Sequence, residues 1–314
     1  MIEVALMVEG QMGLNWTRWQ RIAELAEDFG FTGLYRSDHF TNPEPPDQDS
    51  LELWVSLTWL ASHTQRIEFG PLVTPVSFRH PAHTARMAAA VDDLSGGRLT
   101  LGVGAGWQER EHRTFGFDLL DVPERFDRFE EGLQAIIRLL RSDEPVSLQG
   151  EYYPLKEAIL LPRLARPGGP PVLVGGNGRK RTLPLAARYA DEWNAVFLPA
   201  SEVAGLNDYL DQLLDENDRS PHDVSRSMMT GCVFGRDAKE VEEKARQRSQ
   251  GRYSVQELRQ RGLVIGTAGE IVEQLIRLSE TGLQRVMLQW LDLDDMQSLE
   301  AMAEDVLPQL HPHV

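Results

Sequence analysis

Residues 67–103 read IEFGPLVTPVSFRHPAHTARMAAAVDDLSGGRLTLGV and contain one complete strand–helix–strand unit. The short apolar run 67–73 is typical of a buried strand. Pro81 opens the amphipathic segment 81–94, at a position where proline favours the first turn of a helix. A Gly-Gly turn then leads into a second apolar run at 99–103. We therefore predict two parallel strands joined by a helix.

The same alternation extends in both directions from this unit. Strands are predicted at 4–8, 33–36, 67–73, 99–103, 172–174, 193–197, 228–234 and 285–289. Helices are predicted at 16–29, 50–61, 81–94, 125–140, 180–189, 202–216, 238–250, 270–281 and 296–306. Eight strands, each followed by helix, predict an α/β fold of the (β/α)8 TIM-barrel type, formed by residues 1–314 as a single domain. A doubly wound open sheet is the alternative.

One segment interrupts the alternation. Residues 142–170 are rich in proline and glycine, and two short strand-like runs, 146–148 and 152–155, lie within them. We interpret this segment as an inserted hairpin and loop.

Composition narrows the classes of function. The net charge of −16 argues against nucleic acid or an anionic membrane as a partner, because both attract basic surfaces. A single cysteine excludes a disulfide within the chain and favours a reducing, cytoplasmic location. No apolar run approaches the ~18 residues of a membrane span. The composition thus predicts a soluble, cytoplasmic protein without a nucleic-acid or membrane partner.

In a β/α barrel the active site lies at the carboxyl ends of the strands. Glu9 and Gln11 follow the first predicted strand, Asp38 and His39 the second, and Thr74 the third. Histidine exchanges a proton near neutral pH, so His39 is a candidate acid–base group. An ordinary loop histidine is the structural alternative. No motif for a metal site is present, and no metal is predicted.

Glycines follow the fourth and fifth strands. Gly104 and Gly106 lie in GVGAG, which lacks the spacing of a dinucleotide-binding loop and is as consistent with a structural turn as with a backbone packed against a flat ring. Residues 174–181 read VGGNGRKR, in which Gly175, Gly176 and Asn177 precede a predicted helix. Helix N-termini bind phosphate well, and Arg179 and Lys180 add positive charge, so this turn is a candidate phosphate site. A solvated basic turn is the alternative.

Several of these segments together resemble the luciferase-like monooxygenase superfamily, and specifically its branch that depends on coenzyme F420. The resemblance covers nearly the whole chain and rests on GFTGLYRSDHF, PLVTPVSFRHPA, SGGRLTLGVGAGWQEREHRTFG, ERFDRFEEGL, GEYYPL, PVLVGGNGRKRTLPLAARYADEWN and VIGTAGEIVEQL. It implies a dimeric barrel with a flavin or deazaflavin over the strand ends. It also implies a cis peptide at Pro71–Leu72 behind the ring, with Leu72 and Thr74 beside it.

The resemblance further implies roles for the strand-end residues. Asp38 and His39 would hold the deazaflavin and handle the proton, Gly104 and Gly106 would line the cofactor, and Gly175 and Gly176 would bind its phosphate. Trp107 stands where some sugar-phosphate dehydrogenases of the family have a catalytic glutamate, and Glu109 follows two residues later, which argues against a sugar-phosphate substrate. Glu9, Gln11, Trp107 and Glu109 are the candidates for the substrate side.

The activity expected is hydride transfer between coenzyme F420 and a small organic substrate. The acid before His39 favours the deazaflavin branch, and the tail carboxylates of coenzyme F420 would suit Arg179, Lys180 and Arg181. An FMN-dependent monooxygenase is the alternative, and a flavin-binding protein without turnover is the second alternative. Both cofactors carry a phosphate, so the glycine turn does not distinguish them.

Overall fold

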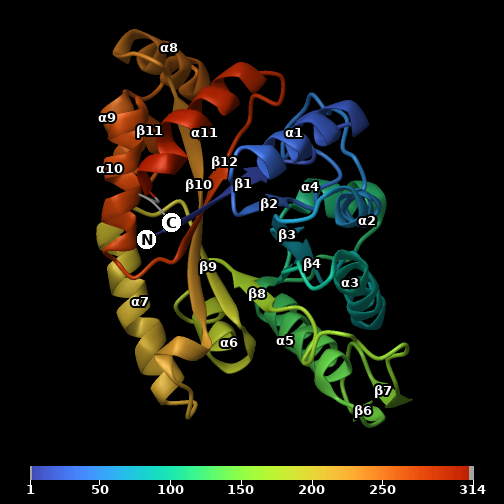
Figure 1. Ribbon diagram of the computed structural model, residues 1–314. Helices are drawn as coiled ribbons and strands as arrows, with labels where there is room; N and C mark the ends of the chain where they lie inside the picture. The colour runs from blue at the N-terminus through green and yellow to red at the C-terminus, as the bar shows by residue number, and fades with distance from the viewer. Residues whose placement is uncertain (1, 311–314) are drawn as a thin grey trace.

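The strands form a closed parallel barrel in the computed structural model, which describes residues 2–310 (Figure 1). Around the barrel the strands are β1 (Glu3–Val8), β2 (Gly33–Arg36), β3 (Glu68–Pro71) with β4 (Thr74–Pro75), β5 (Leu101–Gly104), β8 (Val172–Gly175), β9 (Glu192–Val196), β10 (Ser225–Phe234) and β12 (Arg285–Gln289). β1 pairs with β12 on one side of the barrel. On the other side, Phe69 of β3 donates to the carbonyl of Arg98 and accepts from the N–H of Thr100, so β3 pairs with the residues just before β5 and the barrel is closed. The predicted barrel is confirmed, and the open sheet is wrong.

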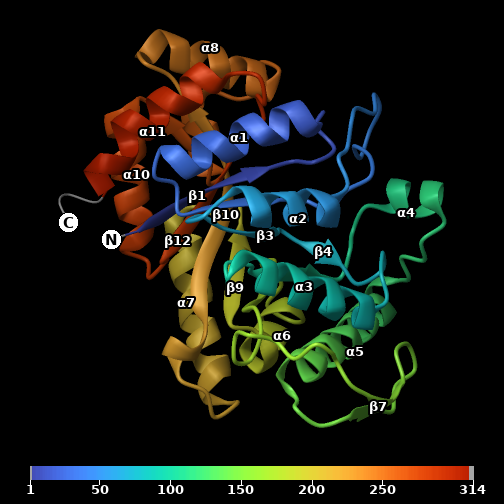
Figure 2. The ribbon, with the colours of Figure 1, turned by 45° about the vertical axis from the view of Figure 1, so that its right-hand side comes forward.

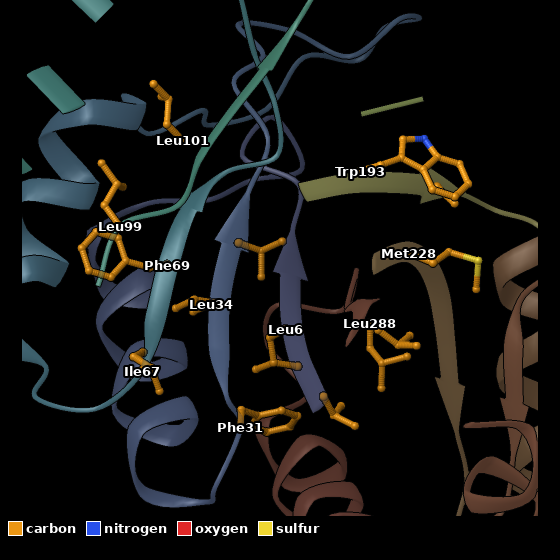
Figure 3. Close-up of a cluster of buried hydrophobic side chains, with 14 of the residues drawn as sticks. Leu6, Phe31, Leu34, Ile67, Phe69, Leu99, Leu101, Trp193, Met228 and Leu288 are labelled. Carbon is orange, nitrogen blue, oxygen red and sulfur yellow. The ribbon is translucent and has the colours of Figure 1, made fainter. Parts of the chain in front are cut away.

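Helices cover the outside of the barrel (Figures 1 and 2). They are α1 (Trp16–Asp28), α2 (Leu53–His63), α3 (Pro81–Ser95), α5 (Val122–Arg141), α6 (Thr182–Tyr189), α7 (Ala200–Asp215), α8 (Ala238–Ser249), α9 (Val255–Gln260), α10 (Ala268–Ser279) and α11 (Met296–Leu310). Figure 3 shows apolar side chains between strands and helices, among them Leu6, Leu34 and Leu288, which are fully buried. No helix within residues 2–310 has both the length and the apolar character that crossing a membrane requires.

Several elements differ from the sequence-based expectation. The short helix α4 (Glu109–Phe115) follows β5 where a loop was expected, and it lies near the end toward which β1 and β4 point (Figure 2). A one-turn 3-10 helix, η1 (Pro221–Asp223), precedes β10. A short strand, β11 (Val264–Gly266), pairs with β10 but is not one of the strands that form the barrel. α2 begins at Leu53, three residues later than predicted, because the side chain of Glu52 accepts a hydrogen bond from the N–H of Val55 and caps the helix.

The third strand is divided. The peptide bond between Leu72 and Val73 is cis, and it separates β3 from β4. The cis bond expected at Pro71–Leu72 is therefore one residue further along the chain.

The inserted hairpin of residues 142–170 is present, with β6 (Val146–Leu148) antiparallel to β7 (Leu155–Ala158). The predicted second strand at 152–155 is displaced. The N–H groups of Tyr152 and Tyr153 donate to the carboxylate of Glu131 on α5, so this stretch bonds to the helix and not to β6.

The amino ends of four strands meet around one arginine. Arg285 begins β12, and its guanidinium lies 2.6 Å from Glu68, 2.7 Å from Glu3 and 3.6 Å from Glu192, which begin β3, β1 and β9. It also donates to the Tyr35 hydroxyl at 2.9 Å. Burial opposes the arginine charge, but these oxygens together raise the pKa of Arg285. The network fills the end of the barrel opposite the expected active site.

Candidate active site

A cavity of about 550 Å³ opens at the carboxyl ends of the strands. Nine of the residues singled out in the sequence line it: Glu9, Gln11, His39, Leu72, Gly104, Gly106, Trp107, Gly175 and Gly176. Much of the remaining wall is apolar and comes from Met7, Val73, Phe126, Phe129, Phe197 and Met229. The strand-end residues therefore meet in one mostly apolar cavity, as parallel strands in a barrel require.

His39 is held by a carboxylate that the sequence analysis did not select. Nδ1 of His39 lies 2.8 Å from Oε1 of Glu111, and Oε2 of Glu111 accepts a hydrogen bond from the N–H of Phe40 at 2.9 Å. Glu111 is almost completely buried, whereas the His39 side chain retains 16% of its exposure and lines the cavity. Since Nδ1 is bound by Glu111, Nε2 is the ring nitrogen left to face a bound molecule.

The pKa of His39 follows from this pairing. Burial alone would lower the pKa, but the hydrogen bond and the negative charge of Glu111 outweigh burial and raise the pKa of His39 above 6.5. The imidazolium form therefore persists to higher pH than in an exposed histidine. Because the folded-state pKa is raised, the pair stabilises the fold fully below pH 6.5, and this contribution is lost as pH rises through the folded pKa.

Changing Glu111→Gln should move the inflection of the pH–rate profile to lower pH, because the charge that raises the pKa of His39 is removed while burial remains. Steady-state rates between pH 5 and 9 measure this shift. Glu109→Gln is the matched control, since Glu109 lies on the same helix but is exposed to solvent. An unchanged inflection in Glu111→Gln, or an equal shift in the control, contradicts the assignment.

Asp38 lies behind the cavity wall. Its carboxylate pairs with Arg79 at 2.5 Å and accepts a hydrogen bond from the Thr74 hydroxyl at 2.7 Å. Asp38 and Thr74 are both buried, and neither lines the cavity. The structure thus brings these two predicted residues together, but it places them where they position the loop that carries His39.

Glu9 and Gln11 belong to a chain of hydrogen bonds along the side of the barrel opening formed by β12, β1 and β2. Oε1 of Glu9 accepts from Nε2 of Gln289 at 2.6 Å, and Oε2 accepts from Nε2 of Gln11 at 3.0 Å. Oε1 of Gln11 accepts from the Ser37 hydroxyl at 2.8 Å. The side chains of Glu9 and Gln11 are therefore fixed in direction beside the segment that carries His39.

The glycine turn after β8 provides donors at its later residues. The N–H of Gly176 is already bound to the carbonyl of Asn194 at 2.9 Å, so it is not free for a phosphate. In the described part of the chain, the N–H groups of residues 177–181 have no backbone or side-chain acceptor. Thr182, the first residue of α6, is buried and lines the cavity with its hydroxyl group near the turn. Unbound N–H groups at a helix start suit an anion.

The polar side chains of this turn point elsewhere. Asn177 bonds twice to the backbone of Val196, donating to its carbonyl and accepting from its N–H, so it joins the turn to β9. Arg179 lies over the ring of Tyr209 and donates to the carbonyl of Gly205. Lys180 is exposed to solvent. None of these three residues lines the cavity described above.

The glycines after β5 have a packing role as well. A Cβ atom on Gly104 would lie 2.6 Å from a methyl carbon of Val73, so glycine is needed for Val73 to approach β5. Gly106 has a φ of +86°, which glycine adopts without strain. Trp107 follows at the rim with 59% of its surface exposed, and its ring meets the His39 ring edge to face at 5.6 Å.

The sequence analysis missed Glu111, Arg125 and Thr182. Glu109 does not reach the cavity and is exposed, whereas Glu111 faces inward with Gln108 and His112. The spacing of residues 108, 111 and 112 is that of one helix face, so an expected helix over this loop would have favoured Glu111. Arg125 lines the cavity and donates to the carbonyls of Gly106 and Leu120.

Comparisons with known proteins agree with this architecture. An F420-dependent glucose-6-phosphate dehydrogenase from Amycolatopsis mediterranei is 27% identical over 317 residues, covering 91% of this chain and 92% of the relative. The structure of an F420-dependent secondary alcohol dehydrogenase in complex with an F420-acetone adduct superposes with a TM-score of 0.85 at 20% identity, covering 98% of this chain and 99% of that one.

A riboflavin lyase with modified FMN also superposes, with a TM-score of 0.82 at 16% identity and coverage of 99% of this chain and 91% of that one. The family model of the luciferase-like monooxygenases matches residues 4–260, which is most of the chain. The chain belongs to the luciferase-like monooxygenase family.

Proposed function

We propose that this protein is an oxidoreductase that transfers a hydride between coenzyme F420 and a small organic substrate. The observation that carries the proposal is the pairing of His39 with buried Glu111 inside a mostly apolar cavity at the strand ends. A curated relative that aligns over nine-tenths of both chains is named an F420-dependent dehydrogenase, which supports this choice of cofactor.

The residues present fit a phosphate-bearing deazaflavin. The unbound N–H groups of residues 177–181 and the hydroxyl of Thr182 would hold its phosphate. Leu72, Val73 and the glycines after β5 and β8 form a wall without long side chains, against which a flat ring fits. When bound, coenzyme F420 would supply or accept the hydride.

The residues of the chain would perform the accompanying proton transfer. Nε2 of His39 would donate a proton to the substrate oxygen or accept one from it, depending on the direction of the reaction. Glu111 fixes the orientation of the ring and stabilises the imidazolium form. The apolar side chains of the cavity, together with Trp107 at its rim, would limit the access of water to the reacting atoms.

An FMN-dependent monooxygenase is the second candidate, because solved structures with FMN share the fold. A cofactor-binding protein without turnover is the third. The chain Gln289–Glu9–Gln11 argues for a reacting partner, because it fixes the polar side chains of Glu9 and Gln11 in the cavity wall.

A titration distinguishes the cofactors. The purified protein should bind coenzyme F420 at least tenfold more tightly than FMN, measured by fluorescence, and the loaded protein should absorb at shorter wavelength than a flavoprotein. Thr182→Val should weaken binding of either cofactor by about tenfold or more, because one hydrogen bond to a charged phosphate is lost. Thr58→Val, at an exposed position on α2, is the control. Tighter binding of FMN would contradict the proposal and favour the monooxygenase.

The remaining predictions concern the molecule as a whole. We propose that residues 1–314 act as a single domain, that the protein is cytoplasmic and that it forms a homodimer. Apolar side chains exposed on neighbouring helices, Trp16 on α1 and Val55 on α2, support an interface there, with 38% and 57% of their surfaces exposed. Arg179 and Lys180 remain candidates for the tail carboxylates of coenzyme F420. Sedimentation velocity measures the oligomeric state, and a monomer at micromolar concentration would contradict the dimer.

A further inference from the structure

Arg248 extends from α8 over the end of the barrel. A Cβ atom on Gly231 of β10 would lie 3.1 Å from Nη2 of Arg248, so the guanidinium occupies space that the glycine leaves open. The same nitrogen donates to Oε1 of Gln289 at 2.7 Å, and Gln289 is the register partner of Gly231 on β12. The arginine head group is thus held at the strand ends by a neutral amide.

No acid neutralises this charge directly. Within residues 2–310, no carboxylate oxygen lies within 4.0 Å of the Arg248 guanidinium. Lys244, one turn earlier on α8, contrasts with it, because it pairs with Glu240 at 2.9 Å and with Asp295 at 3.1 Å. Burial lowers the pKa of Arg248, which reflects the cost of keeping the cation away from water. Arg248 is only half-buried, so its guanidinium can be reached from solvent, and a cation without a paired acid is suited to bind an anion.

The guanidinium faces a second cavity of about 440 Å³. One side of this cavity is apolar, with Cys232, Phe234 and Trp290, and the other carries Lys244, Gln247 and Arg248. Burial raises the pKa of the Cys232 thiol to about 12, so the thiol adds no negative charge. Asp295 is bound to Lys244, and Asp292 is exposed to solvent at the rim. The cavity therefore combines an apolar wall with one cation that has no carboxylate within 4.0 Å among the described residues.

A chain of hydrogen-bonded side chains links the second cavity to the first. Gln289 donates to Glu9, which lines the first cavity, so Arg248 is two hydrogen bonds from that wall. Around the barrel, β10 is four strands from β3 and β4 in either direction, which places Arg248 across the opening from Leu72. A deazaflavin ring bound against Leu72 would leave the side of the opening near Arg248 free for the organic substrate.

We propose that Arg248 binds an anionic group of the organic substrate, a carboxylate or a phosphate, in this second cavity, while the reacting carbon lies near His39 in the first. The guanidinium has a planar fork of donors that matches either oxyanion. This inference rests on the proposed function for the identity of the reaction, but binding of an anion at Arg248 does not depend on which cofactor is used.

The test measures anion binding by isothermal titration calorimetry at constant ionic strength, with succinate and inorganic phosphate as probes and chloride as the balancing salt. Wild-type protein should bind at least one probe, both without cofactor and after loading with coenzyme F420. Arg248→Met should weaken binding by about tenfold or more, because it removes charged hydrogen bonds. Arg246→Met is the matched control on the same helix, where the arginine is exposed, and it should bind as wild type does.

A stability measurement keeps the test independent of folding. Without probe, Arg248→Met should melt no lower than wild type, because it removes a half-buried charge that has no paired acid. The inference is overturned if wild type binds neither probe, or if Arg248→Met binds as wild type does. Loss of probe binding after loading with coenzyme F420 would assign the cavity to anionic groups of the cofactor and overturn it too. Retained probe binding in a protein that does not bind coenzyme F420 would contradict the proposed function alone.

Discussion

Replacing His39 by alanine should lower turnover by about 10²- to 10⁴-fold, the range typical of general acid–base catalysis, while cofactor affinity changes far less. The reason is geometric: Nδ1 of His39 is bound by Glu111, and the rest of the ring faces the cavity. A proton must enter or leave with each hydride, and His39 is the histidine that lines this cavity within the described residues. Stopped-flow measurement of the cofactor spectrum across pH follows the step directly.

His112→Ala is the matched control for this prediction. His112 is buried on the same side of the barrel, but its nitrogens bond to Ser77 and to the carbonyl of Gln108 and it does not line the first cavity. The control should lose stability and keep turnover near that of wild type in the folded fraction. A rate in His39→Ala within threefold of wild type, with the same pH dependence, would mean that His39 does not transfer the proton.

Replacing Arg285 by methionine should lower the free energy of unfolding by about 3–5 kcal/mol, the usual cost of removing one partner from a buried ionic network. Arg285 keeps only 13% of its side-chain exposure, and Glu192 keeps 8%. Without the arginine, Glu192 loses its counter-ion and Tyr35 loses a hydrogen-bond donor. Urea unfolding followed by circular dichroism measures the difference.

The loss in Arg285→Met should depend on pH. Burial already raises the pKa of Glu192, and removing the arginine raises it further, so the folded state binds protons more tightly than the unfolded state. A group with a raised folded pKa stabilises the fold at low pH, and that contribution disappears as pH rises. The deficit should therefore be larger at pH 8 than at pH 5. Arg277→Met, which breaks an exposed pair with Glu273, should cost no more than about 0.5 kcal/mol. Equal effects of the two changes would contradict a structural role for the network.

The sequence by itself determined the barrel and the end at which the site lies. Alternating apolar runs and amphipathic segments specify the local elements, and eight parallel strands close in only a few ways. Because the active site of a barrel lies at the carboxyl ends of its strands, the residues that follow each strand could be chosen from the sequence. Seven residues chosen for that reason line one cavity, together with Leu72 and Trp107, which the family resemblance added. The strand assignments failed mainly where a distant side chain bonds to the backbone, as Glu131 does at residues 151–153.

Only the tertiary structure decided which groups act together. Glu109 and Glu111 are two residues apart and equally acidic, but the packing of α4 turns Glu111 toward His39, 72 residues away, and leaves Glu109 in solvent. Asp38 and His39 are neighbours, but Asp38 turns away to pair with Arg79. Arg248 meets Gln289 across 41 residues of sequence. Such pairings depend on the direction of each side chain within a packed barrel, which local sequence patterns do not encode, because they record periodicity and not the identity of the facing residue.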